Sequence, residues 1–92
     1  MILVTKIKMR PGCWNSQNLT EIDSVYLTGL GDPGFYPKEN VHAFLKDHPG
    51  TIRVGVWPNP DVVPATSIYG EKYVKSTPNQ YGFDNLLSLP RE

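Results

Sequence analysis

The sequence predicts a single α+β domain over residues 1–92, in which a small, mostly antiparallel β-sheet packs against one main helix. Three observations support this fold class. Several segments alternate apolar and polar residues with the period of a β-strand, whereas only one segment repeats apolar residues at helical spacing. A chain of 92 residues also has the length of one domain, whose core is modest at this size.

The first predicted strand covers residues 1–10 and ends at Pro11-Gly12, a turn signal. Alternation along this strand is expected to give one face with Leu3, Thr5, Ile7 and Met9, and an opposite face with Lys6, Lys8 and Arg10. A second strand is expected over residues 19–28, where β-branched and aromatic residues gather. Its apolar residues do not keep one phase, so the alternatives are a β-bulge or burial on both faces.

The one predicted helix extends from Pro37 to roughly Asp47, after a glycine-rich loop over residues 29–35. Proline suits the first helical position, and Pro49-Gly50 ends the helix. Helical spacing predicts a buried stripe of Val41, Phe44, Leu45 and His48, with Lys38, Asn40 and Lys46 facing water. The preceding loop lacks the Lys-Ser/Thr ending of a phosphate-binding loop, so we interpret it as a connection.

The second half of the chain predicts more strands and a closing apolar plug. Residues 51–57 alternate again, and Pro64 predicts that residues 62–69 form an edge strand or an irregular one. A hairpin with a two-residue type II′ turn is expected at Gly70-Glu71, and Asp84 is placed to cap a short helical turn. On these grounds the predicted core consists of Leu3, Ile7, Val41, Phe44, Leu45, Ile52, Val54, Val56, Val74, Leu86 and Leu87.

Composition restricts the compartment and the class of partner. Nine basic and nine acidic residues give a formal charge of zero, so no long-range attraction draws the protein to nucleic acid or to anionic membranes. Cys13 is the single cysteine, which excludes an intramolecular disulfide. The apolar run at residues 2–4 is too short for a signal segment or a membrane span. We therefore expect a cytoplasmic protein without membrane association.

No catalytic constellation emerges from the residue types and their spacing. His42 and His48 are six residues apart, about 240° around a helix, so they cannot hold one metal ion together. We expect His42 on the surface and His48 at the helix C-terminus, where the dipole favours it. Cys13 has no flanking motif of a nucleophile and is interpreted as a small apolar loop residue. The prediction is a protein that is not an enzyme, with no metal and no cofactor.

Two groups of residues are candidates for binding. Trp57 is expected to face outward before a Pro-Asn-Pro turn, where it either anchors a protein partner or covers its own sheet edge. Lys6, Lys8 and Arg10 are expected to line up about 7 Å apart, a spacing that suits phosphates, although a solvated strand face explains them equally. The neutral net charge favours the interpretation of these residues as a solvated strand face. The leading hypothesis is therefore a non-catalytic protein-interaction module, with weak nucleic-acid binding as the alternative.

The C-terminal segment carries a Lys-Tyr-strand-Thr motif followed by Asp-Asn-Leu-Leu-x-Leu-Pro. The positions of the motif are Lys72, Tyr73, Thr77, Asp84, Asn85, Leu86, Leu87, Leu89 and Pro90. This pattern resembles the ending of a bacterial family known as domain of unknown function 3892. The resemblance implies a compact small domain and no established reaction. Where that family often has Asp-Gly, this chain has Asn79-Gln80-Tyr81-Gly82, a difference that affects the turn type. We interpret the motif residues as structural.

Overall fold

The computed structural model describes residues 1–56, 59–77 and 85–92, which form the α+β architecture that the sequence predicts. Among these residues no helix is long and apolar enough to cross a membrane. The elements in chain order are β1 (Ile2–Met9), the 3₁₀-helix η1 (Leu19–Glu21), β2 (Ile22–Thr28), β3 (Gly34–Pro37), α1 (Lys38–Asp47), β4 (Ile52–Val54), β5 (Val62–Thr66), β6 (Lys72–Ser76) and the 3₁₀-helix η2 (Asn85–Ser88).

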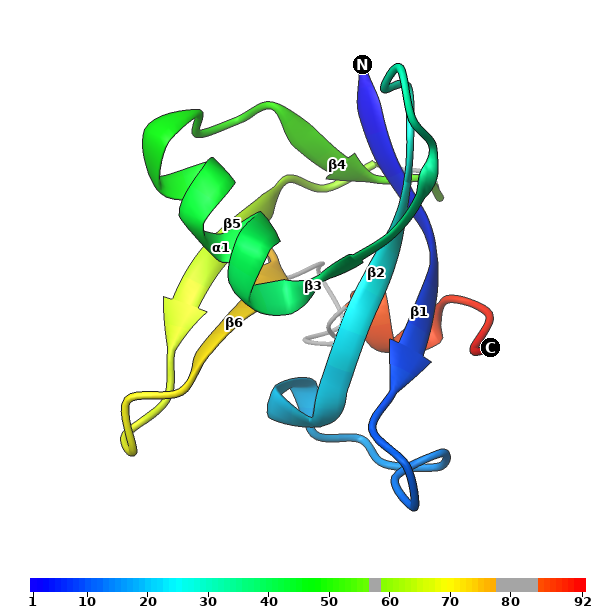
Figure 1. The fold of residues 1–92 in the computed structure, drawn as a ribbon, viewed down its shortest axis with the longest axis vertical. Coiled ribbons are helices and arrows are strands. Elements are labelled where there is room, and N and C mark those ends of the chain that lie inside the picture. The colour runs from blue at the N-terminus through cyan, green and yellow to red at the C-terminus, as the bar shows by residue number, and fades with distance from the viewer. Residues whose placement is uncertain (57–58, 78–84) are drawn as a thin grey trace.

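The strands form two sheets where the sequence predicts one. A four-stranded sheet has the order β3-β2-β1-β4, and β5 pairs with β6 in a separate antiparallel hairpin. Within the larger sheet β1–β2 and β2–β3 are antiparallel, whereas β4 runs parallel to β1. Helix α1 and the hairpin lie on the same side of the four-stranded sheet (Figure 1). The core lies between these two layers.

A β-bulge in β1 changes which residues face the core. Val4 pairs with Leu27 and Lys6 pairs with Tyr26, so that Thr5 is an extra residue in the ladder. The bulge resets the alternation, and Val4 and Ile7 both point into the core. The prediction that Leu3 belongs to the core is wrong for this reason. A second register shift, opposite Lys8 and Met9, confirms that β2 carries the irregularity expected of it.

Helix α1 has the predicted extent, but its buried stripe is rotated by about one position. The buried residues are Lys38, Val41, His42 and Leu45, whereas Phe44 is 39% exposed and His48 is exposed. The predictions that Lys38 and His42 face water are wrong, because both side chains find polar partners inside the fold. The Lys38 ammonium group contacts Glu71, and Nδ1 of His42 lies 3.0 Å from the carbonyl oxygen of Tyr73.

The hairpin turn lies two residues earlier than predicted. The amide of Gly70 donates to the carbonyl of Ser67, so Ile68 and Tyr69 are the central turn residues. Gly70 follows them with φ of +83°, a conformation that glycine adopts readily. The pairing of β5 with β6 through Pro64 is confirmed, and Val74 is buried on the face opposite Tyr73 and Lys75.

The buried core draws on β1, β2, α1, β4, β5, β6 and the C-terminal segment with η2. The predicted members Ile7, Val41, Leu45, Ile52, Val54, Val74 and Leu86 are confirmed, while Leu87 is half-buried and Val56, beyond the end of β4, is 52% exposed. Predicted strand 51–57 is in fact only three residues long, and β3 was not predicted. Additional core residues are Val4, Met9, Ile22, Val25, Leu27, Val62 and Leu89.

Candidate functional site

An apolar pocket opens at one end of the core, between α1 and the four-stranded sheet. Its volume is about 180 Å³, it is partly open to solvent, and its lining is almost entirely apolar. The lining residues are Ile2, Leu27, Leu30, Tyr36, Asn40, Val41, Phe44 and Ile52. We call this the open end of the core; on β1 it lies at the Ile2 end.

The lining of the open end is supplied by strands, a loop and the helix. Ile2 and Ile52 are paired neighbours on the parallel strands β1 and β4, and both line the pocket. On the helix, Val41 and Phe44 form one wall, while Asn40 supplies the one amide side chain of the lining. The Tyr36 hydroxyl donates to the carbonyl of Asp32 and so fixes the loop beside the mouth. The pocket is therefore a continuation of the core to the surface.

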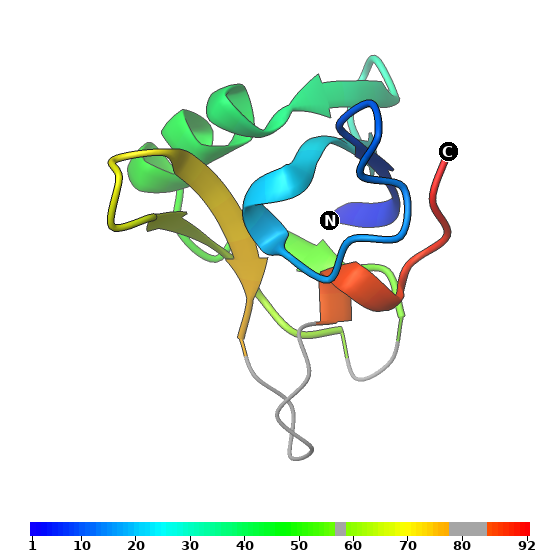
Figure 2. The ribbon, with the colours of Figure 1, turned by 90° about the horizontal axis from the view of Figure 1, so that it is seen from below.

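The opposite end of the core, toward the Met9 end of β1, is closed by the C-terminal segment. Helix η2 packs against β1 and β6 (Figure 2). Leu86 within η2 and Leu89 just after it are buried. Beyond it, the Ile7 amide donates to the Pro90 carbonyl, and the Glu92 amide donates to the Ile7 carbonyl. We call this the sealed end of the core.

Arg91 fastens the sealed end to the loop that follows β1. Its guanidinium group donates to the carbonyl oxygens of Trp14 and Ser16 at 2.8 Å and to that of Leu87 at 3.0 Å. Two carbonyl acceptors in this loop and one in η2 are thus joined by one side chain. Sequence reasoning did not single out Arg91, because none of its acceptors is a side chain.

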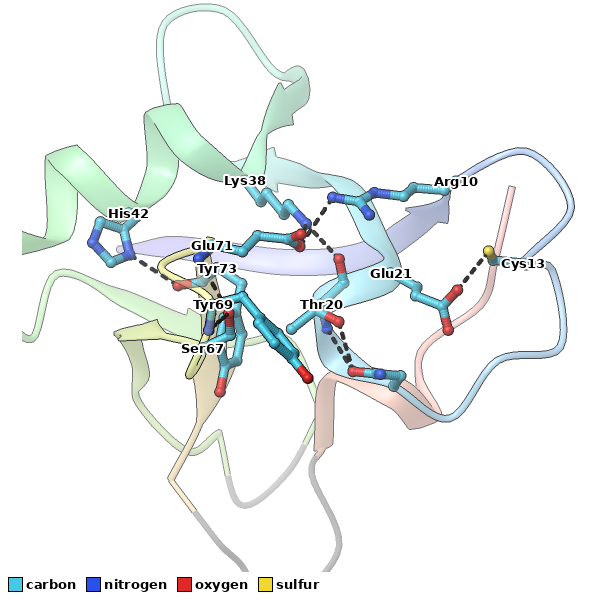
Figure 3. A network of polar contacts seen from close by, with 11 residues as sticks. Arg10, Cys13, Thr20, Glu21, Lys38, His42, Ser67, Tyr69, Glu71 and Tyr73 are labelled. Carbon is cyan, nitrogen blue, oxygen red and sulfur yellow. Dashed lines mark hydrogen bonds and ion pairs between the residues drawn. The ribbon is translucent and has the colours of Figure 1, made fainter.

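A cluster of charges around Glu71 also lies at the sealed end. Lys38 and Arg10 both donate to Oε2 of Glu71, at 2.7 Å and 2.9 Å, and Lys38 donates as well to the carbonyl of Thr20 (Figure 3). Lys38 is 1% exposed. The hydrogen bond from Lys38, with that from Arg10, holds the pKa of the Glu71 carboxyl below its usual value. This cluster joins the hairpin to η1, α1 and the end of β1.

Cys13 lies in an open depression with Glu21. The thiol donates to Oε2 of Glu21 at 2.7 Å, and the Ser16 hydroxyl donates to the other carboxylate oxygen. The hydrogen bond to Glu21 is the main cause of a raised pKa for Cys13, and the same bond lowers the pKa of Glu21. Cys13 is therefore a protonated thiol at neutral pH, a weak nucleophile. Among the described residues no group of three or more His, Cys, Asp or Glu side chains is placed to hold a metal ion.

The structure separates the three basic residues that the sequence groups together. Lys6 and Lys8 lie over the rings of Tyr26 and Phe35, at 4.9 Å and 5.9 Å from the ring centres. The two rings contact edge to face, with 5.1 Å between their centres. We call these four residues the outer sheet face, since α1 and the hairpin cover the other side. Arg10 instead pairs with Glu71, and Lys6 also pairs with Glu92 at 3.1 Å.

The other predicted site residues take structural positions where the structure describes them. The carbonyl oxygen of Tyr73 lies at hydrogen-bond distance from Nδ1 of His42. The amide of Thr77 donates to the carbonyl of Asp61, and the carbonyl of Pro90 accepts from the Ile7 amide of β1. Asn85 begins η2. Trp57 and Asp84 lie outside the described residues. Sequence reasoning missed the pocket, because its lining comes from six separate segments.

Comparison with known proteins gives one family. The family model of DUF3892, described as a protein of unknown function, matches residues 4–90, nearly the whole chain. No curated protein and no solved structure gives a match. The match begins within β1 at Val4, includes all later elements through η2 and ends at Pro90, the last residue of the C-terminal motif. The chain belongs to the protein family DUF3892.

Proposed function

We propose that the protein is a non-catalytic protein-interaction module of the cytoplasm, which receives an apolar side chain of a partner in the pocket at the open end of the core. The observation that carries this proposal is the pocket itself: a cavity of about 180 Å³ lined almost entirely by apolar side chains and reachable from solvent. Apolar side chains that stay accessible beside a core are typical of binding surfaces.

Size and chemistry favour one large apolar side chain as the occupant. An apolar cavity of about 150 Å³ holds a benzene ring, so the volume here suits a Phe, Leu or Met side chain. The Asn40 amide, exposed at the mouth, offers a donor and an acceptor to the backbone of the inserted segment. Phe44, 39% exposed, widens the apolar contact around it.

The non-catalytic part of the proposal rests on how the nucleophile and base candidates are engaged. The Cys13 thiol is bonded to Glu21 and its pKa is raised, and Nδ1 of His42 is bonded to the Tyr73 carbonyl inside the core. Neither histidine shares a described contact with Cys13. Trp57, which lies outside the described residues, stays a predicted contact of the partner.

Selection from a displayed library of random peptides tests this function. We expect the enriched peptides to share one bulky apolar residue and to shift the amide NMR signals of Leu30, Tyr36, Asn40 and Phe44. The variant Asn40→Trp, which fills the mouth, should lose these shifts, while Lys46→Gln on the far side of α1 should keep them. Peptides that bind equally to wild type and Asn40→Trp would contradict the proposal.

Nucleic-acid binding is a second candidate, supported by the outer sheet face. Two lysines and two aromatic rings on one sheet surface combine the charge and stacking groups that hold single strands. Arg10 no longer belongs to this candidate site, and Glu92 neutralises Lys6. These pairings, with the zero net charge, place it second.

Fluorescence anisotropy with a labelled single-stranded oligonucleotide tests the second candidate. Binding should weaken steeply as salt rises and should be lost when Lys6 and Lys8 are both changed to Gln. The matched control changes Lys46 and Lys75, two exposed lysines elsewhere, to Gln. Absence of binding at low salt, or equal binding by both double variants, would reject it.

A further inference from the structure

The tip of the β5–β6 hairpin presents two large apolar side chains to solvent. Ile68 is 93% exposed and Tyr69 is 90% exposed, and the tip lies at the periphery of the molecule in both ribbon views (Figures 1 and 2). The central positions of a tight turn favour Gly, Asn, Asp, Pro and Ser. Turn chemistry therefore gives no reason for Ile and Tyr at these two positions.

The tip is held in shape by its own hydrogen bonds. The Ser67 hydroxyl accepts the amides of Tyr69 and Glu71, and the Ser67 amide donates to the Glu71 carbonyl. Glu71 is in turn fixed by Lys38 and Arg10. Ile68 and Tyr69 thus project from a preorganised support, which lowers the entropic cost of inserting them into a partner.

The pocket at the open end of the core matches the side chains of the tip in size and polarity. The pocket holds one ring-sized apolar group, and Tyr69 supplies a ring whose hydroxyl can reach the polar mouth at Asn40. Charges beside the two features are opposite: exposed Lys72 follows the tip, and exposed Asp32 lies beside Tyr36 at the mouth. Within one molecule Ile68 and Tyr69 are exposed and do not line the pocket, so both features are accessible to a second copy.

We propose that the protein associates with itself, with Ile68 and Tyr69 of one copy seated in the apolar pocket of a second copy. This inference rests on the proposed function, because it names the occupant of the same pocket. The contact joins two different surfaces, so it is heterologous and propagates head to tail. Because the net charge is zero, two copies do not repel each other through a net charge. A contact of this size is weak, and we expect it at protein concentrations of about 0.1 to 1 mM.

Mixing experiments with isotope-labelled variants separate the two surfaces. In wild type, amide signals of the tip and of the pocket should shift together as concentration rises. Labelled protein carrying Ile68→Ser and Tyr69→Ser should show no such shifts alone, but unlabelled wild type should shift its pocket signals. Labelled Asn40→Trp mixed with unlabelled wild type should show the reverse, with shifts at the tip only. Trp14→Ser, which removes an exposed aromatic side chain from another loop, should behave as wild type.

A charge swap tests whether Lys72 of one copy lies against Asp32 of the other. Lys72→Asp alone and Asp32→Lys alone should each weaken the association about threefold to tenfold, and the two variants mixed together should recover it. The inference is overturned if wild type shows no concentration-dependent shifts up to 1 mM, or if the serine variant associates like wild type.

Benzene distinguishes failure of this inference from failure of the proposed function. If benzene shifts the pocket signals of the serine variant while wild-type protein does not, the pocket binds apolar groups and the second copy is not its occupant. If neither benzene nor wild-type protein shifts them, both the inference and the proposed function are wrong.

Discussion

The two ends of the core are built from the same kinds of residue and closed in different ways. At the sealed end Leu86 and Leu89 are buried by η2, and Arg91 and Glu71 tie the surrounding turns together. At the open end Ile2, Leu30 and Phe44 line a pocket that solvent can enter. Within residues 1–56, 59–77 and 85–92, the chain thus supplies a plug at the sealed end and none at the open end. This difference is the basis of our proposal that the sealed end contributes stability and the open end contributes binding.

The largest effect is expected from opening the sealed end. Leu86→Ala removes a fully buried side chain that η2 presses onto β1 and β6, so it leaves a cavity. We expect a loss of about 2 to 5 kcal/mol in the free energy of unfolding, measured by denaturant titration. For a small domain this is a large fraction of the total. A loss below about 1 kcal/mol would mean that η2 does not seal the core.

A smaller effect, with a defined pH dependence, is expected at Glu71. Its pKa is lowered in the folded state by Lys38 and Arg10, so its contribution to stability is full above the unfolded pKa of about 4.3 and disappears as pH falls through the folded value. Glu71→Gln should therefore lower the melting temperature at pH 7, and the difference from wild type should vanish under acid conditions.

Glu39→Gln, on the exposed side of α1, is the matched control for this pH series. A Glu71→Gln deficit in melting temperature that stays constant down to pH 2 would show that the charge of Glu71 is not the cause.

The asymmetry of the cluster is also testable. Loss of Glu71 leaves the buried Lys38 ammonium without its anion, whereas loss of Arg10 does not.

The smallest effect on stability is expected at the open end. Phe44 is 39% exposed and stacks on His48, with 4.6 Å between ring centres, so Phe44→Ala should cost about 1 kcal/mol or less. The same substitution should weaken peptide binding at the pocket at least tenfold. A stability loss comparable with that of Leu86→Ala would remove the contrast between the two ends.

The sequence predicts the fold class, the extent of α1, the edge character of β5 and the C-terminal plug, because each depends on local periodicity or turn chemistry. It places Leu3 and Phe44 wrongly for reasons that are not local. The bulge at Thr5 is set by pairing with β2, and the rotation of α1 is set by Glu71 and the Tyr73 carbonyl, which receive Lys38 and His42.

The candidate site was not predictable in the same way. The lining of the pocket comes from β1, β2, the loop after it, β3, α1 and β4, and no single segment carries a signal for it. Lys6, Lys8 and Arg10 share a period in the sequence, yet ion pairs with Glu92 and Glu71 draw two of them to different partners. Contacts between residues distant in sequence thus determine both the lining of the pocket and the separation of the three basic residues.

The most direct test of the claim that the open end binds is an NMR titration of wild type and Asn40→Trp with benzene, following the methyl signals of Ile2, Leu30, Ile52 and Leu86. The account predicts saturable shifts at Ile2, Leu30 and Ile52 in wild type, none at these methyl groups in Asn40→Trp, and no response of Leu86 in either protein. Shifts of Leu86 as large as those of Ile52, or no shifts at the open end in wild type, would contradict it.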